Sequence, residues 1–134
     1  ELKKILKNNK KKCIPLPVSA PFHCSLMNPA AIKMKEKIDA VNFKKPDFEI
    51  VSNVTASTVT RPEDIKKLLV QQIYSKVRWR ESIIFMDKEK VQDFIEIGPG
   101  KVLTGLVKRI SPNSNCFSIN SINDIKNLKN EPER

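Results

Sequence analysis

The sequence is poor in histidine, cysteine and aromatic residues, and it has no long hydrophobic run. Its 134 residues include one histidine and three widely spaced cysteines, Cys13, Cys24 and Cys116, without a Cys-x-x-Cys pair. An odd number of scattered cysteines argues against a disulfide framework and a zinc site, and it indicates a reducing compartment. No apolar stretch approaches the length of a membrane span, and the lysine-rich start has no signal-peptide core. Because Glu1 stands where an initiator methionine is expected, we expect a fragment or a processed product.

The net charge is +10, which is large for a chain of this size. It indicates either an anionic partner or compositional drift, since lysine, asparagine and isoleucine are abundant throughout. A basic nucleic-acid-binding module is therefore one hypothesis. The single tryptophan and single tyrosine, with no helix-turn-helix or RNA-binding signature, argue against it. Filter binding across salt would test it, because true nucleic-acid binders show a steep salt dependence. A purely structural fragment is a further alternative.

Apolar periodicity predicts helices that alternate with short buried strands, and therefore an α/β fold with a largely parallel sheet. Asn28 is expected to cap one helix, whose apolar face carries Ala30, Met34, Ile38 and Val41. Thr60 and Glu63 have the spacing of a capping box for the helix predicted over residues 60–73. The predicted helices cover residues 1–9, 28–41, 60–73, 77–88, 101–110 and 123–130. The predicted strands cover residues 13–18, 46–53, 91–97 and 115–119, and residues 53–60 form a loop or strand.

The lone histidine, His23, lies in the loop 19–25, between a strand-like run and a helix start. It could be a core residue, a metal ligand or a general base. A metal role is disfavoured because no second histidine or cysteine pair is present. Proton transfer is favoured because imidazole changes charge near neutral pH and reactive groups gather at strand ends of α/β sheets. A base needs a nucleophile, yet no Gly-x-Ser-x-Gly turn occurs.

The segment Gly98-Pro99-Gly100-Lys101 could be taken for a phosphate-binding loop. It lacks the Walker spacing and the Lys-Ser/Thr ending, so nucleotide binding is disfavoured. The glycines are expected to let a strand turn sharply into a helix.

Five segments match, in order and with plausible spacing, the C-terminal portion of one enzyme family. They are residues 16–19, the histidine loop 19–27, 51–55, 71–79 and 95–110. Taken together, they resemble the malonyl-CoA:acyl-carrier-protein transacylases. The resemblance implies an α/β-hydrolase-like acyltransferase domain interrupted by a ferredoxin-like subdomain, of which the chain holds rather less than half. Residues 1–17 would be the last helix and strand of the small subdomain, and 18–134 the C-terminal part of the large one.

The resemblance also implies roles for residues. His23 would be the base that activates a serine outside this chain, so the chain alone is expected to be inactive. The main-chain carbonyl of Gln72 would orient the histidine ring. Phe22, directly before the histidine, would favour malonyl over branched acyl groups by steric crowding. The malonyl-binding arginine and the oxyanion hole would lie upstream of this chain.

The implied reaction moves malonyl from CoA to the thiol of an acyl carrier protein in fatty acid biosynthesis, with no metal or redox cofactor. The implied partners are malonyl-CoA, an acidic carrier protein and the serine-bearing part of the same enzyme. The anionic carrier protein could be steered by Lys101, Lys108 and Arg109, or by Lys76 and Arg80. Transacylases of this kind occur in bacterial cytosol, mitochondria and plastids, and the lysine-, asparagine- and isoleucine-rich composition leads us to expect an organelle.

Overall fold

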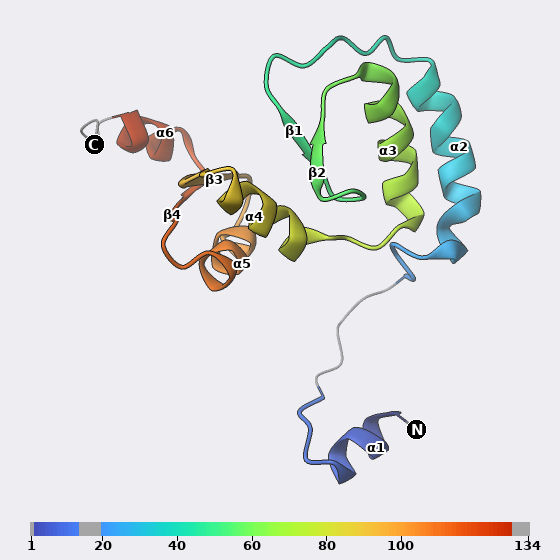
Figure 1. Cartoon of the computed structure of the whole chain (residues 1–134), viewed down its shortest axis with the longest axis vertical. Helices are drawn as coiled ribbons and strands as arrows, with labels where there is room; N and C mark the ends of the chain where they lie inside the picture. Colours follow the sequence, from blue (N-terminus) through green and yellow to red (C-terminus); the bar gives the residue numbers. More distant parts are fainter. Residues whose placement is uncertain (1, 14–19, 130–134) are drawn as a thin grey trace.

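The computed structural model describes residues 2–13 and 20–129 of the chain (Figure 1). It contains helices, a short 3-10 helix (η1) and four strands. In chain order these are α1 (Leu2–Asn8), η1 (Ser25–Met27), α2 (Asn28–Asp39), β1 (Ile50–Ser52), β2 (Ser57–Val59), α3 (Pro62–Tyr74), α4 (Trp79–Lys88), β3 (Asp93–Ile97), α5 (Val102–Ile110), β4 (Asn115–Ile119) and α6 (Ile122–Lys129).

The predicted elements are found within a few residues of their expected positions. The strand expected over residues 13–18 lies almost entirely outside the described residues, as does the proposed subdomain boundary at residue 17. Both predicted helix caps are wrong. Asn28 is already helical, because η1 runs directly into α2 and Met27 takes the capping position. At α3 the flanking residue is Arg61 rather than Thr60, since Pro62 begins the helix and holds the preceding residue extended.

The strands form two separate pairs, so the expectation of a largely parallel sheet is only partly correct. β1 and β2 form an antiparallel hairpin in which Ile50 faces Val59 and Ser52 faces Ser57. Its turn closes with Ala56 at a φ of 53° and a hydrogen bond of 2.8 Å from Ala56 N to Ser52 O. β3 and β4 are parallel and in register from Asp93 opposite Asn115 to Ile97 opposite Ile119.

Two groups of elements are visible in Figure 1. In one, α2 and α3 lie side by side with the β1–β2 hairpin beside α3. In the other, α5 packs against β3 and β4, α6 packs against β4, and α4 packs against α5. Ala31 and Ile65 are buried in the first group, and Ile83 and Val107 in the second. Among the described residues, Ile83 is the one large side chain that is fully enclosed.

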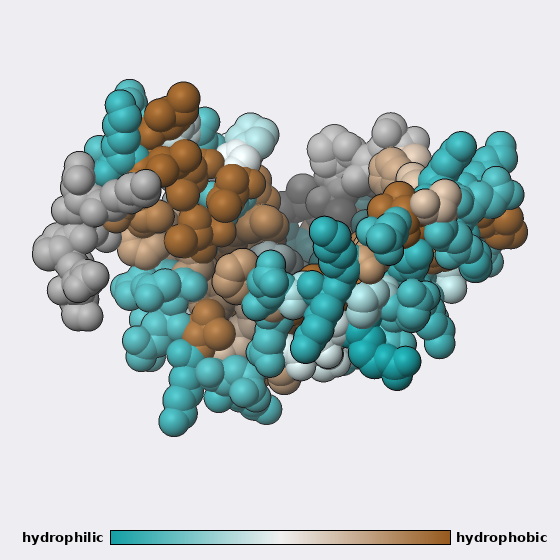
Figure 2. All heavy atoms as spheres, turned by 90° about the horizontal axis from the view of Figure 1, so that it is seen from above, coloured by the Kyte–Doolittle hydropathy of each residue, from teal (hydrophilic) through white to brown (hydrophobic). Residues whose placement is uncertain are grey.

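Many apolar side chains remain at the surface (Figure 2). The predicted apolar face of α2 is partly correct: Ile38 is half-buried, but Ala31 rather than Ala30 is buried and Met34 is exposed. Val41 lies beyond the end of α2 and is also exposed. Large exposed apolar side chains of the described residues include Leu26, Ile32, Phe48, Ile97 and Ile122. These residues come from both groups of elements.

The β3-to-α5 turn is held by one carboxylate. Glu96 accepts hydrogen bonds from the main-chain N–H groups of Leu103 (3.1 Å) and Thr104 (2.8 Å), which would otherwise be unpaired at the start of α5. Gly98 and Gly100 have φ values of 141° and 100°, which the sharp turn requires. Because a carboxylate already occupies the α5 amino terminus, the structure gives a phosphate no place there.

Glu96 predicts a pH-dependent contribution to stability. The hydrogen bonds from Thr104, its main-chain N–H first, hold the pKa of Glu96 below its ordinary value. A lowered folded-state pKa stabilises the fold above the unfolded pKa and loses that contribution as pH falls through the folded value. Glu96→Gln should therefore lower the melting temperature by several degrees near neutral pH, and the difference should shrink in acid. Thermal unfolding followed by circular dichroism measures this. The exposed Glu49→Gln is the control, and an equal effect in both variants would contradict the prediction.

Candidate functional site

The histidine loop is a short, internally bonded turn ahead of η1 and α2. The N–H of Phe22 donates to Ala20 O (2.9 Å), and the thiol of Cys24 donates to Pro21 O (3.1 Å). His23, between them, has a φ of 58°. Residues other than glycine seldom adopt this left-handed conformation, and when they do they are enriched at functional sites. The loop therefore presents an exposed imidazole on a defined backbone.

The imidazole is tied to α3, 49 positions away in sequence. His23 Nδ1 lies 2.9 Å from the main-chain oxygen of Gln72. A carbonyl oxygen only accepts hydrogen bonds, so Nδ1 donates, and in the neutral ring Nε2 carries the free lone pair. Gln72 lies in the last turn of α3, where carbonyl groups have no partner within the helix. The helix end thus supplies an acceptor that needs no particular side chain.

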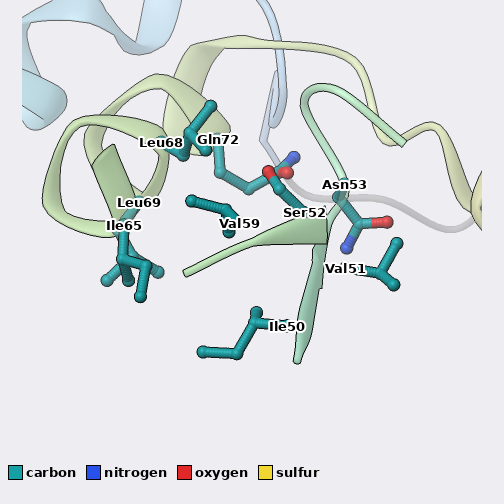
Figure 3. Close-up of a pocket in the computed structure, with 9 residues that line it drawn as sticks. All are labelled: Ile50, Val51, Ser52, Asn53, Val59, Ile65, Leu68, Leu69 and Gln72. Carbon is teal, nitrogen blue, oxygen red and sulfur yellow. The ribbon is translucent and has the colours of Figure 1, made fainter. Parts of the chain in front are cut away.

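A groove of about 180 Å³ adjoins this contact, between the β1–β2 hairpin and α3 (Figure 3). Its lining is largely aliphatic, with Ser52, Asn53 and Gln72 as the polar members. In Figure 3 the polar ends of Gln72 and Ser52 lie at one end of the groove, and Ile50 and Ile65 lie at the other. Gln72 thus accepts the hydrogen bond from His23 through its main-chain carbonyl and lines the groove with its side chain. Ser52 and Asn53 were not among the predicted site residues, although polar residues ending a strand of β-branched residues are a usable signal.

Arg78 was also missed by sequence reasoning. Its guanidinium Nη1 donates to Thr55 O (3.1 Å), and its main-chain N–H donates to Asn53 O (3.2 Å). Its Nε lies 3.6 Å from a carboxylate oxygen of Glu81. Arg78 therefore links the turn of the β1–β2 hairpin to the start of α4. These contacts, near Asn53, connect the two groups of elements.

The other predicted site residues lie in two places. Phe22 is next to His23, and its side chain is 58% exposed. Lys101, Lys108 and Arg109 are exposed at the two ends of α5, in the group around β3 and β4 and apart from the histidine loop (Figure 1). Arg109 Nε donates to Gly105 O at 3.1 Å, within its own helix. The structure therefore brings Phe22, His23 and Gln72 together and places the three basic residues elsewhere.

Within residues 2–13 and 20–129, no three histidine, cysteine or acidic side chains are grouped so that they could hold a metal ion. None of the helices in the described part of the chain is long and apolar enough to cross a membrane.

Proteins with similar sequences and structures include malonyl CoA-acyl carrier protein transacylases and acyl carrier protein S-malonyltransferases. The malonyl CoA-acyl carrier protein transacylase of Bacillus subtilis is 53% identical over 104 residues, which are 78% of this chain and 33% of the relative. An acyl carrier protein S-malonyltransferase from Vibrio cholerae matches with a TM-score of 0.82 and 40% identity, over 88% of this chain and 39% of that one. The chain is homologous to the malonyl-CoA:acyl-carrier-protein transacylases.

The homology to transacylases is strong but partial. The chain spans about a third of the length of its Bacillus subtilis relative. A malonyl-transacylase solved in complex with its type II polyketide acyl-carrier protein matches with a TM-score of 0.81 and 39% identity, over 90% of this chain and 40% of that one. No family model matches the chain. The predicted resemblance and the α/β fold class are confirmed, and the homology favours an acyltransferase over a nucleic-acid-binding module.

The His23 contact predicts one tautomer. In the isolated chain, the neutral ring should carry its proton on Nδ1 and not on Nε2. Nitrogen-15 NMR of the ring distinguishes the two forms, and His23 is the one histidine of the sequence, so assignment is direct. A ring protonated mainly on Nε2, the form that predominates in free histidine, would contradict the contact with Gln72 O.

Proposed function

We propose that this chain is the C-terminal part of a malonyl-CoA:acyl-carrier-protein transacylase of fatty acid biosynthesis. The observation that carries the proposal is the hydrogen bond from His23 Nδ1 to Gln72 O. It leaves Nε2 exposed and able to accept a proton, in a chain homologous to transacylases. The serine that a histidine base requires would come from polypeptide other than these 134 residues, since no Gly-x-Ser-x-Gly turn occurs in them.

The proposed reaction has two balanced halves. As the serine oxygen attacks the thioester carbonyl of malonyl-CoA, Nε2 of His23 takes the hydroxyl proton. The carbon–sulfur bond then breaks, and the imidazolium returns the proton to the departing CoA thiolate. In the second half the carrier-protein thiol attacks the malonyl-serine ester while His23 takes the thiol proton, which passes to the departing serine oxygen. The Gln72 carbonyl stabilises the imidazolium in both halves, because its negative end points at Nδ1–H.

The chain alone should not transfer malonyl, so the proposal is tested in a complete enzyme. A suitable one is a hybrid in which this chain replaces the matching third of the Bacillus subtilis transacylase, to which it is 53% identical. Incubation with malonyl-CoA should yield a malonyl-serine adduct detectable by mass spectrometry. His23→Ala should slow adduct formation by about 10²–10⁴-fold, the usual contribution of a general base. The neighbouring Cys24→Ser is the matched control. Equal rates for wild type and His23→Ala would reject the proposed base.

Phe22 would set selectivity for the acyl group. Its ring is exposed beside His23, where it would crowd an α-methyl substituent on the acyl chain. Phe22→Ser in the hybrid should therefore raise kcat/KM for methylmalonyl-CoA relative to malonyl-CoA by roughly tenfold, the scale of one methyl group in a fitted pocket. Phe48→Ser, at an exposed phenylalanine in the loop before β1, is the control. An unchanged ratio in Phe22→Ser would remove the steric explanation.

The basic residues of α5 would steer the carrier protein. Lys101, Lys108 and Arg109 are exposed, and a relative of this chain was solved in complex with its acyl-carrier protein. Changing all three to glutamate should reduce the second-order rate constant for the carrier protein by about tenfold at low salt, because steering is electrostatic. The control changes Lys3, Lys4 and Lys7 of α1 to glutamate, which alters the net charge equally. If the second-order rate constant falls equally in both triple variants, net charge and not the α5 surface is responsible.

Two further expectations stay predictions. The division into a small-subdomain end (1–17) and a large-subdomain part (18–134) would be tested by an experimental structure of the complete enzyme. The organellar location would be tested by fractionating the source cell.

A further inference from the structure

The carbonyl that holds the His23 ring lies at a helix end. α3 ends at Tyr74, two residues after Gln72, and the N–H of Ser75 closes the helix by donating to Gln71 O (2.9 Å). Ser75 then turns to an extended backbone with a ψ of 151°. Carbonyl groups in the last turn of a helix have no further partner within it, and helix ends fray. The chain that follows α3 therefore has to keep Gln72 O in place.

Arg78 is the residue that fastens the chain after α3. Its main-chain N–H donates to Asn53 O (3.2 Å), and its guanidinium Nη1 donates to Thr55 O (3.1 Å). Among the described residues, these are the hydrogen bonds that join the β1–β2 hairpin to the chain beyond Tyr74. The main-chain oxygen of Arg78 also accepts from the N–H and the hydroxyl of Ser82, both at 2.9 Å. Ser82 is buried in α4, so Arg78 is attached to the hairpin on one side and to α4 on the other.

This anchor lies close to the His23 contact, both along the chain and across the groove. Arg78 comes six positions after Gln72. The connection of residues 75–77 between α3 and Arg78 is short, and two of its three residues are exposed. Across the groove, Asn53 from the hairpin and Gln72 from α3 both contribute to the lining (Figure 3). Fastening Arg78 to Asn53 therefore holds the last turn of α3 against the hairpin.

The hydrogen bond from the guanidinium matters more than the ion pair. Arg78 Nε lies 3.6 Å from a carboxylate oxygen of Glu81, and exposed ion pairs of this kind contribute little stability. A charge-assisted hydrogen bond to a carbonyl is stronger and directional. Arg61 offers a comparison, because it precedes α3 as Arg78 precedes α4. Its Nε lies 3.7 Å from Asp64, also three residues on, but within the described residues its guanidinium makes no hydrogen bond to another element.

We propose that Arg78 is a positioning residue for the base. By anchoring the chain after α3 to the turn of the β1–β2 hairpin, it keeps Gln72 O within hydrogen-bond distance of His23 Nδ1. It acts through the end of α3 and not on the imidazole itself. Without the guanidinium the last turn of α3 would fray, and the neutral ring would divide its proton between both nitrogens. This inference rests on the proposed function for the role of the ring as a base, whereas the anchor is a feature of this chain alone.

The first test follows the one histidine of the isolated chain by nitrogen-15 NMR. Arg78→Met removes the donor but keeps the apolar stem, and it should raise the fraction of neutral ring protonated on Nε2 at least about twofold, because the bond to Gln72 O weakens. Arg78→Lys keeps one donor and should recover most of the wild-type spectrum. Arg61→Met is the matched control and should leave the ring unchanged. If Arg78→Met does not fold, Arg78→Gln, whose side chain is shorter, is measured in its place.

The second test uses the Bacillus subtilis hybrid and does not depend on the isolated chain. Arg78→Met should lower the maximal rate of malonyl-serine formation by about tenfold, because the base is less well oriented. The malonyl-CoA concentration that gives half of this rate should change by less than about twofold, since substrate binding is retained. Arg78→Lys should recover most of the rate, and Arg61→Met should keep all of it.

Two results would overturn the inference. One is a wild-type ring spectrum and a wild-type rate in Arg78→Met, even with a lower melting temperature, since that combination indicates a purely structural role. The other is an equal effect of Arg78→Met and Arg61→Met, which would attribute the change to lost charge. The proposed base is judged separately by His23→Ala. A ring that changes in Arg78→Met, in a hybrid indifferent to His23→Ala, would reject the proposed base alone. A hybrid that requires His23 but ignores Arg78→Met would reject the positioning role alone.

Discussion

The candidate site depends on one hydrogen bond between the histidine loop and the end of α3. His23 and Gln72 are 49 positions apart, so the contact exists only when η1, α2 and α3 pack together. The buried Ala31 of α2 and Ile65 of α3 support that packing. The left-handed backbone at His23 then aims the ring at a carbonyl that the helix itself cannot use. Local strain, helix packing and an unpaired helix end together determine one ring orientation.

In the second group of elements, the β3-to-α5 turn is well hydrogen-bonded, but apolar side chains of β3 are exposed. Around Glu96 the hydrogen bonding is well satisfied, because one carboxylate pairs the free N–H groups of α5 and Asn120 Oδ1 accepts from Gly100 N at 2.6 Å. Ile95 and Ile97, on either side of Glu96 in β3, are exposed. A parallel sheet normally buries both of its faces, so exposed isoleucines beside this well hydrogen-bonded turn are unusual. His23 is the proposed base, and a base without a nucleophile is half of a catalytic pair.

Much of the fold could be predicted from periodicity, and the failures have identifiable physical causes. The strand over residues 115–119 was predicted with its observed bounds, because the apolar run is flanked by turn residues. The caps at Asn28 and Thr60 were wrong because a 3-10 turn and a proline moved the helix starts. The antiparallel β1–β2 pair was missed because its turn depends on Ala56 at positive φ, which no composition rule indicates. Of the site, His23 could be singled out by its residue type and position. The contact with Gln72 came from the family resemblance, since no local pattern joins residues so far apart.

The partner of His23 is a main-chain atom, and this has an evolutionary consequence. Any residue that keeps α3 helical through position 72 offers the same oxygen in the same place. The hydrogen bond to His23 therefore depends on the length and register of the helix and not on the side chain at position 72. Comparing side chains alone would therefore overlook the group that holds the imidazole.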